Sequence, residues 1–186
     1  MIGVIQQFGP LGVFALMVPE SACIPVPSEV TLLFSGFAVS QHWMSFVVAV
    51  VAATLGNVVG SLIAYGIGAT RVVERIPGGR GLMRRWEHTL DDRGLRAIFL
   101  ARLLPLARTF VSLPAGARRV PLVPFVVLTT LGCALWAVAF VLIGLFSGAA
   151  WGAVSSILGK VLLGAGLALV AWVAYRATHR DRQPGS

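Results

Sequence analysis

The stretch FLARLLPLARTFVSLPAG, residues 99–116, decides what kind of fold this chain can form. It is apolar enough to lie in a membrane, yet it contains Arg102, Arg108, Pro105 and Pro114. A proline removes a backbone donor and clashes with the preceding turn, so it interrupts a helix. Interrupted backbone survives at membrane depth only where protein or a wet cavity surrounds it. The stretch therefore predicts half-helices that fold back as a re-entrant hairpin and line a site.

The composition of the whole chain agrees with a membrane location. Of its 186 residues, 57% are apolar and 12% are charged, and the mean hydropathy is +0.86. Soluble domains are about a quarter charged. Residues 1–70 contain two charged side chains, Glu20 and Glu29, and residues 121–175 contain one, Lys160. Long charge-free stretches of this kind are typical of an integral membrane protein.

Apolar segments of two kinds alternate along the chain. Three are uninterrupted and reach the roughly 20 residues that a bilayer requires: residues 43–68, 122–146 and 157–175. Two are interrupted by prolines: residues 11–38 by Pro19, Pro25 and Pro27, and residues 95–117 by Pro105 and Pro114. Each interrupted segment is followed by a turn and an uninterrupted one. A unit of one hairpin and one transmembrane helix is therefore predicted to occur twice.

Positive charge predicts how the two units are oriented. Seven arginines lie from Arg71 to Arg96, two more are Arg118 and Arg119, and others lie in the tail. Basic loops stay in the cytoplasm, so the second hairpin should enter from the cytoplasm and the first from the outside. The repeats are thus predicted to be inverted, with hairpin tips that meet near mid-membrane and a cytoplasmic C-terminus. The arginines form no face interleaved with aromatics, so no nucleic-acid partner is expected.

The predicted fold is a single all-α polytopic membrane domain over residues 1–186. Its parts are a first repeat (1–70), a cytoplasmic basic connector (71–94), a second repeat (95–148), a final C-terminal transmembrane helix (149–176) and a basic tail (177–186). The connector is rich in glycine and is expected to lead into an interfacial helix over residues 82–92. Cys23 and Cys133 lie in apolar runs without disulfide or zinc spacing, so they are expected to be small core residues.

Four charged residues lie inside the interrupted segments: Glu20, Glu29, Arg102 and Arg108. A charge at membrane depth costs about 2.5 to 3.5 kcal/mol on insertion scales. Such residues can reach the interface or form inert structural pairs, but interrupted backbone beside each one favours a functional role. The first hairpin holds only acids and the second only bases, so convergent tips would place two carboxylates and two guanidiniums in one cavity.

The chemistry of these groups predicts separate roles. A guanidinium is a rigid fork of donors that matches phosphate oxygens, so Arg102 and Arg108 are predicted to bind a phosphate. A carboxylate in a low-dielectric cavity binds a proton more readily than in water, so Glu20 and Glu29 are predicted to couple protons or to gate access. Half-helix N-termini near Ser28 and Thr109 would add supporting donors.

Three sequence strings together resemble the DedA family, also called the VTT or SNARE-associated domain. They are PESACIPVPSEVTLLFSGF (19–37), GNVVGSLIAYGIG (56–68) and the stretch at 99–116, followed by Phe125, Gly132 and Trp136. The resemblance covers residues 19–148. It implies a transporter of lipid phosphates with two opposed re-entrant hairpins. Bacterial members return undecaprenyl phosphate across the cytoplasmic membrane and act in proton-dependent homeostasis, whereas eukaryotic relatives scramble phospholipids.

The resemblance also assigns residues. Family acidic positions match Glu20 and Glu29, and essential family arginines match Arg102 and Arg108. Many members carry an acid where this chain has Asn57, which is therefore expected to have a supporting role at most. The chain is predicted to be a flippase of the bacterial cytoplasmic membrane that recycles undecaprenyl phosphate, or a similar lipid phosphate, with proton coupling.

Other functions stay open as alternatives. One is a less selective phospholipid scramblase, and another is a non-transporting membrane-organising scaffold. An enzyme acting on lipid phosphates would need a nucleophile or metal cluster, yet no GxSxG or HExxH string occurs and the histidines lack metal-ligand spacing. We therefore expect no enzymatic activity, no cofactor and no metal.

Two weaker patterns concern packing. Small-xxx-small spacing at Gly56 and Gly60, and from Gly144 to Gly152, is expected to bring helices close within the monomer, with a homodimer as the alternative. Tryptophans near the ends of spans are expected to be interfacial anchors, with stacking in a cavity as the alternative: Trp43, Trp136, Trp151 and Trp172.

Overall fold

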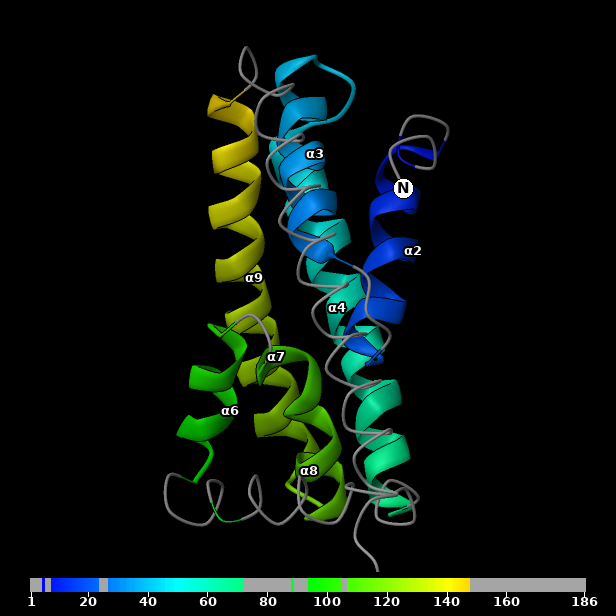
Figure 1. Ribbon diagram of the computed structural model, residues 1–186, viewed down its shortest axis with the longest axis vertical. Coiled ribbons are helices and arrows are strands. Elements are labelled where there is room, and N and C mark those ends of the chain that lie inside the picture. Colours follow the sequence, from blue (N-terminus) through cyan, green and yellow to red (C-terminus); the bar gives the residue numbers. More distant parts are fainter. Residues whose placement is uncertain are drawn as a thin grey trace, which may run out of the picture. The chain divides into compact units, whose positions relative to one another are not determined.

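The computed structural model describes residues 5, 8–23, 27–71, 88, 94–104 and 107–147. All of them belong to the compact unit Met1–Gly148. Within these ranges the regular structure is helical, without strands (Figure 1). The predicted final span at 157–175, the basic tail and, apart from His88, the predicted interfacial helix at 82–92 lie outside the described residues.

The first hairpin consists of α2 (Pro10–Ser21) and α3 (Ser28–Ser40). The residue before a proline disfavours the helical conformation, and α3 begins only after Pro25 and Pro27, as predicted. Cys23 has φ of 71°, which ends the preceding turn in the left-handed region. Pro19 was also predicted to interrupt the segment, and this is wrong, because it lies inside α2. It stands two residues before the last residue of the helix, within the last turn.

The second hairpin consists of three short helices: α6 (Arg96–Arg102), α7 (Ala107–Phe110) and α8 (Ser112–Ala117). The break between α6 and α7 contains Pro105, as predicted. The prediction that Pro114 also interrupts the helix is wrong. Pro114 is the third residue of α8, where a backbone N–H would have no partner within the helix, so its missing donor costs nothing.

Two long helices follow the hairpins: α4 (Phe46–Ala69) and α9 (Leu122–Phe146). The bounds of α9 match the prediction. The helix α4 begins three residues later than predicted, because the Ser45 hydroxyl caps it by accepting a hydrogen bond from the Val48 N–H at 3.3 Å. Both helices have the length and apolar composition of membrane spans.

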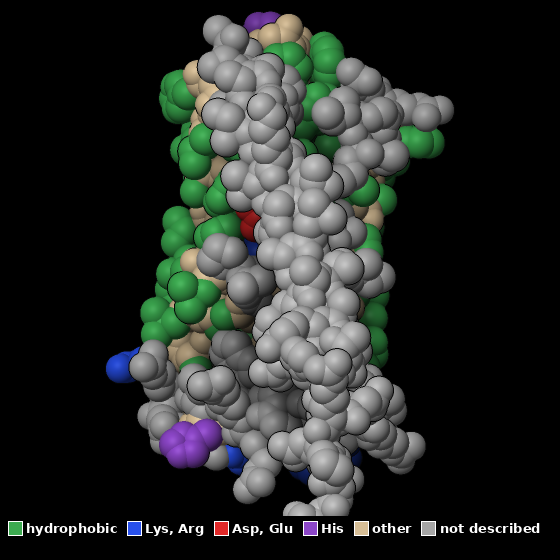
Figure 2. All heavy atoms as spheres, in the orientation of Figure 1, with side chains coloured by type: hydrophobic (Ala, Val, Ile, Leu, Met, Phe, Trp, Pro, Cys, Tyr) green, Lys and Arg blue, Asp and Glu red, His purple; other side chains and the backbone are tan. Residues whose placement is uncertain are grey.

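The outer faces of α4 and α9 are apolar and exposed. Only 44% of the most apolar part of α4 and 28% of that of α9 are buried, whereas a soluble core helix would be mostly buried. Exposed side chains recur about every fourth residue, at Val47, Val51, Leu55 and Val59 in α4 and at Val123, Val127, Leu131 and Leu135 in α9. Figure 2 shows apolar side chains along both edges of the visible face. These faces suit lipid contact.

The two hairpins reach toward each other from opposite ends of the long helices (Figure 1). α3 packs along α9, and α8 packs along α4. A Cβ at Gly36 would collide with the Val141 carbonyl, and one at Gly144 with the Leu33 carbonyl. The contact between α8 and α4 is built alike: a Cβ at Gly116 would collide with the Tyr65 carbonyl and one at Gly68 with the Leu113 carbonyl. In each of these two helix contacts, which we call the glycine seams, a pair of glycines thus allows the backbones to touch.

The predicted close packing at Gly56 and Gly60 lies within the monomer. Both glycines face α2, where added Cβ atoms would meet the Phe14 carbonyl at 2.6 Å and the Val18 carbonyl. A homodimer stays an untested alternative.

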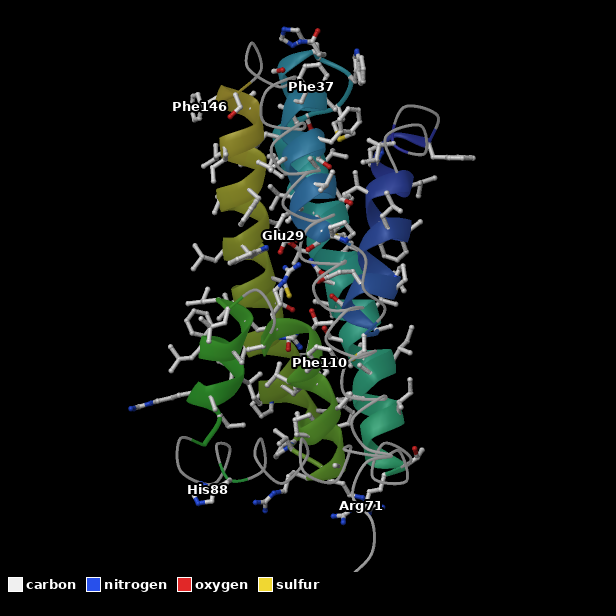
Figure 3. The ribbon with its side chains drawn as sticks, in the orientation of Figure 1. Glu29, Phe37, Arg71, His88, Phe110 and Phe146 are labelled. Carbon is white, nitrogen blue, oxygen red and sulfur yellow. The ribbon has the colours of Figure 1, made fainter. Side chains whose placement is uncertain are left out.

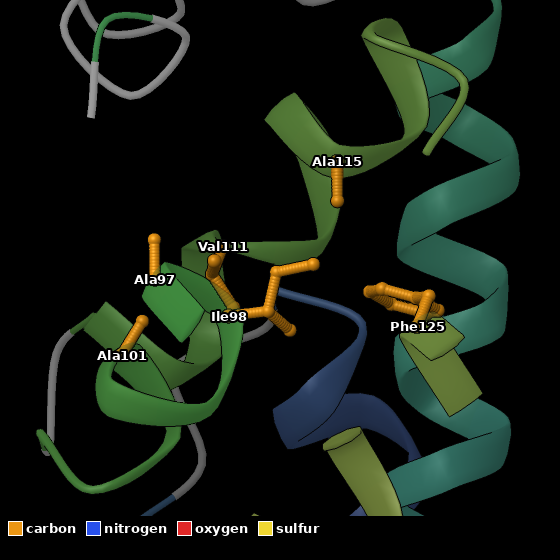
Figure 4. Close-up of a cluster of buried hydrophobic side chains, with 6 residues drawn as sticks. All are labelled: Ala97, Ile98, Ala101, Val111, Ala115 and Phe125. Carbon is orange, nitrogen blue, oxygen red and sulfur yellow. The ribbon is translucent and has the colours of Figure 1, made fainter. Parts of the chain in front are cut away.

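A buried cluster fixes the second hairpin on α9. It contains Ala97, Ile98, Ala101, Val111, Ala115 and Phe125, contributed by α6, α8, the turn before α8 and α9 (Figure 4). The Tyr65 ring packs 4.9 Å from that of Phe125, and the Tyr65 hydroxyl donates to the Val120 carbonyl at 2.6 Å. The arginines at the ends of α6 and α7 therefore project from a packed scaffold.

Candidate functional site

The two helix breaks meet in a buried polar cluster. The end of α2 contributes Glu20 and Ser21, the start of α3 contributes Ser28 and Glu29, and α7 contributes Arg108. In Figure 3 the labelled Glu29 lies between the end marked by Phe146 and the end marked by Arg71, nearer to Phe146. The cluster therefore lies within the length of the long helices and not at either end.

Arg108 is at the centre of the cluster. Its Nη2 donates to Glu20 Oε1 at 2.7 Å and to the Ser28 hydroxyl, and it lies 3.9 Å from Glu29 Oε1. Its guanidinium carbon is 5.0 Å from the centre of the Trp136 ring. The Arg108 side chain is 5% exposed, and its Nε has no hydrogen-bond partner. Arg108 thus joins both halves of the first hairpin to the second.

Arg102 makes a different set of contacts. Its Nη1 donates to the Arg108 carbonyl at 2.8 Å, and its Nη2 donates to the hydroxyls of Ser112 at 2.8 Å and Thr129 at 3.2 Å. Among the described residues, no carboxylate lies within ion-pair distance of it. A Cβ at Gly132 would lie 2.5 Å from the Arg102 Cβ, so glycine makes room for this side chain. Arg102 ties α6, α8 and α9 to the α7 backbone.

The two carboxylates differ in their surroundings. Glu20 is 6% exposed at its side chain and, besides Arg108, accepts hydrogen bonds from Ser21 at 3.2 Å and Thr109 at 3.4 Å. Glu29 is 25% exposed and lies farther from Arg108. Glu20 is therefore the enclosed partner of the guanidinium, and Glu29 is the accessible one.

A second layer of polar groups extends the cluster to α4. The Ser21 hydroxyl also lies 2.5 Å from Asn57 Oδ1, and the Asn57 amide nitrogen lies 3.7 Å from the Met17 sulfur. A serine hydroxyl has one proton, so Ser21 donates fully either to Glu20 or to Asn57. Asn57 is 1% exposed, so both alternative hydrogen bonds of the Ser21 hydroxyl lie in a buried environment.

The structure brings the predicted site residues together. Glu20, Ser28, Glu29 and Thr109 surround Arg108 or its partner carboxylate, whereas Asn57 joins through Ser21. Arg102 contacts the Arg108 backbone rather than an acid. The roles of these residues stay predictions.

Within the described residues, no three His, Cys, Asp or Glu side chains form a group that could hold a metal ion. Both cysteines are free, and Cys23 donates to the Thr109 carbonyl at 3.2 Å.

Sequence reasoning missed three polar members of the cluster: Ser21, Ser112 and Thr129. They are hydroxyl residues within or beside apolar runs, a signal too common to single them out. Trp136 was predicted to be an interfacial anchor, with stacking in a cavity as the alternative. The anchor prediction is wrong, because Trp136 is the fifteenth of the 25 residues of α9, and its ring stacks on the buried Arg108, in agreement with the alternative. Trp43, by contrast, lies at the exposed turn before α4.

Comparison with known proteins places the chain in a family. The VTT domain matches residues 26–146. An alkaline phosphatase-like protein of Lactococcus lactis is 36% identical over 170 residues, which cover 85% of this chain and 79% of the relative. Undecaprenyl phosphate transporter A of Bacillus subtilis is 31% identical over 148 residues, 72% of this chain and 71% of the relative.

The protein of the same name from Staphylococcus aureus is 28% identical over 151 residues, which cover 75% of this chain and 74% of that protein. No solved structure matches this chain. The VTT match begins within the break before α3 and covers the arginines of the second hairpin and both long helices. On these grounds the chain belongs to the VTT domain family, the DedA family of membrane proteins.

Proposed function

We propose that the protein moves undecaprenyl phosphate, or a similar polyprenyl phosphate, from the outer to the inner leaflet of the bacterial cytoplasmic membrane, and that protons move with it. The observation that carries the proposal is the buried Arg108 guanidinium between Glu20 and Glu29, at the meeting point of two helix breaks. The names of the B. subtilis and S. aureus relatives supply the lipid.

In this proposal the hairpins are re-entrant and the two repeats are inverted. The matching glycine seams, α3 with α9 and α8 with α4, support such a symmetry. Arginines follow α4 and α8, and another begins α6. Figure 1 shows these three helix ends at the same end of the long helices. The positive charge there supports a cytoplasmic location for this end of the protein. The connector at 71–94 would be cytoplasmic, and a final helix within 149–176 would return the chain to the same side.

The charges of the cluster link phosphate binding to proton binding. Two guanidiniums and two carboxylates sum to zero when all are ionised. A phosphate monoester brings about −1.5 to −2 charges near neutral pH, which a membrane interior does not tolerate uncompensated. Uptake of protons by Glu20 and Glu29 would restore the balance. Binding of lipid phosphate and of protons would thus favour each other.

The contacts of Arg108 suggest how this exchange proceeds. The Nη2 that would bind a phosphate oxygen is occupied by Glu20 at 2.7 Å. Protonation of Glu20 removes its negative charge and releases the guanidinium for phosphate. Glu29, which is more exposed, would lie on the side from which protons reach the cluster. Ser28 and Thr109 would add hydroxyl donors, and Asn57 would adjust Glu20 through Ser21.

Arg102 would act second in phosphate binding. Both of its Nη atoms already donate to protein oxygens, and only its Nε is without a partner. Its main contribution would be to hold the α7 backbone and thereby aim Arg108. A Lys at either position keeps the charge but loses the planar fork of donors.

The test is leaflet exchange of labelled undecaprenyl phosphate in vesicles that contain the purified protein, with and without a pH gradient. We expect the labelled lipid to cross faster in the direction in which protons flow down the pH gradient. Arg108→Lys should slow this exchange at least tenfold. Arg96→Lys, which changes an exposed arginine at the start of α6, is the matched control and should exchange lipid as the wild type does. Wild-type rates for Arg108→Lys would refute guanidinium recognition of phosphate.

The same vesicles separate the alternatives. A phospholipid scramblase would move labelled phosphatidylglycerol as fast as undecaprenyl phosphate and without a gradient. A lipid phosphatase, the activity suggested by the name of the L. lactis relative, would release inorganic phosphate. Either result would replace the proposed function.

A further inference from the structure

We infer that Trp136 is a further ligand-binding residue, whose indole N–H donates to an oxygen of the phosphate headgroup while its ring holds the Arg108 guanidinium. This inference rests on the proposed function, because it names a third side chain at the same site. The ligand class is an anionic phosphate monoester attached to an apolar chain.

The first observation is the depth of Trp136. Fourteen residues of α9 precede it and ten follow it, so it lies about 21 Å and about 15 Å from the two helix ends. A tryptophan at a membrane interface satisfies its N–H among lipid headgroups and water. Trp136 is too deep in the helix for that, so membrane anchoring does not account for it.

The second observation is an unsatisfied donor. The Trp136 Nε1 is buried and has no hydrogen-bond partner. Buried tryptophan N–H groups normally have a partner, and an orphaned buried donor in a native structure calls for an explanation. An acceptor that is present only when the ligand is bound supplies one.

The third observation is what Trp136 touches. Its ring lies 5.0 Å from the Arg108 guanidinium carbon, and the Phe140 ring stacks against it at 4.7 Å. The Arg108 Nε is likewise buried and without a partner. Two side chains in contact therefore each hold an N–H donor without an acceptor. A phosphate monoester has three oxygens that can accept from both.

A purely structural role predicts different behaviour. If Trp136 only stacks on Arg108, a phenylalanine should retain most of the binding, because it keeps an aromatic face for the cation, although a weaker one than that of tryptophan. If the N–H binds phosphate, Trp136→Phe should weaken binding about tenfold, the usual loss for one hydrogen bond to a charged group. The comparison isolates the donor from the ring.

The experiment uses the full-length protein in lipid nanodiscs. In one variant the other tryptophans, Trp43, Trp86, Trp151 and Trp172, are changed to Phe, so that fluorescence reports on Trp136 alone. We expect undecaprenyl phosphate to change this fluorescence saturably and the uncharged alcohol undecaprenol to have no effect. A control protein that retains only Trp43, in the Phe34 and Phe37 cluster outside the site, should not respond.

Binding of undecaprenyl phosphate is then compared between Trp136→Phe and Leu135→Phe, a change at an exposed neighbour on α9. We expect Trp136→Phe to bind about tenfold more weakly and Leu135→Phe to bind as the wild type does. Wild-type affinity in Trp136→Phe, or a Trp136 signal that does not respond to the lipid, would overturn the inference. If Arg108→Ala still loses binding, the proposed function survives that result. If the wild type itself fails to bind, both fall.

Discussion

The ion pair between Arg108 and Glu20 gives a quantitative prediction about stability. The two side chains are 5% and 6% exposed, and their closest atoms are 2.7 Å apart. Removing one partner of a buried pair leaves an uncompensated charge, which costs about 3 to 5 kcal/mol. We therefore expect Arg108→Met to lower the free energy of unfolding by that amount, since no other arginine nitrogen of the described residues is in ion-pair range of Glu20.

A second substitution should reverse the loss. In Glu20→Gln the buried charge is absent, so Arg108→Met combined with Glu20→Gln should recover about 2 kcal/mol or more of the stability lost by Arg108→Met alone. The assay is reversible unfolding in mixed micelles, analysed as a double-mutant cycle. Arg96→Met is the control and should change the free energy by less than about 0.5 kcal/mol, because Arg96 is exposed.

The cycle also separates stability from function. The double variant should be folded and yet unable to bind lipid phosphate, because its guanidinium is gone. The reasoning would be refuted if Arg108→Met were as stable as the wild type, or if the second substitution recovered nothing. In either case the negative charge of Glu20 would not depend on Arg108 for its neutralisation.

Three further predictions follow from other contacts. Gly144→Ala should lower the free energy of unfolding by about 1 to 3 kcal/mol, because the added Cβ would collide with the Leu33 carbonyl. Gly66→Ala is the control and should not, because Gly66 has open space around it. Equal free energies of unfolding for the two variants would contradict the close contact between α3 and α9. The affinity of the wild type for lipid phosphate should increase on acidification, because protonated carboxylates release Arg108. In the double variant Glu20→Gln/Glu29→Gln, the affinity measured over the same pH range should depend less on pH. An unchanged pH profile in this variant would show that the two acids do not couple proton binding to lipid binding. Tyr65→Phe should lower the free energy of unfolding by about 0.5 to 1.5 kcal/mol, because it loses the hydrogen bond to the Val120 carbonyl. Lipid transport in vesicles should be unchanged. A loss of transport would show that this contact does more than hold the scaffold.

Much of the architecture could be predicted because prolines and charges are rare in apolar segments and therefore informative. The break before Ser28 and the break around Pro105 were both expected. Pro19 and Pro114 were misjudged, because the effect of a proline depends on its position within the helix. Pro114 stands in the first turn of α8, which packs on α4, and neither the start of this helix nor its packing is visible in a linear pattern.

The site was predictable to a similar degree. The four charged residues stood out because charge at membrane depth is costly, and the inverted orientation led us to expect the two hairpin tips to meet. The difference between the arginines was not predictable: Arg102 and Arg108 have equivalent places in R-x-x-P-x-x-R, yet only Arg108 faces the acids. That outcome depends on the hydroxyls of Ser112 and Thr129, which are brought to Arg102 by folding.

The most direct test of the account measures how close the phosphorus of the bound lipid lies to the Arg108 side chain. Solid-state NMR on membranes containing protein labelled with ¹⁵N in arginine side chains detects dipolar contact between ¹⁵N and the ³¹P of undecaprenyl phosphate. The account predicts a contact of about 4 Å that disappears in Arg108→Lys and persists in Arg96→Lys. A contact that survives Arg108→Lys unchanged, or that disappears only in Arg96→Lys, would contradict it.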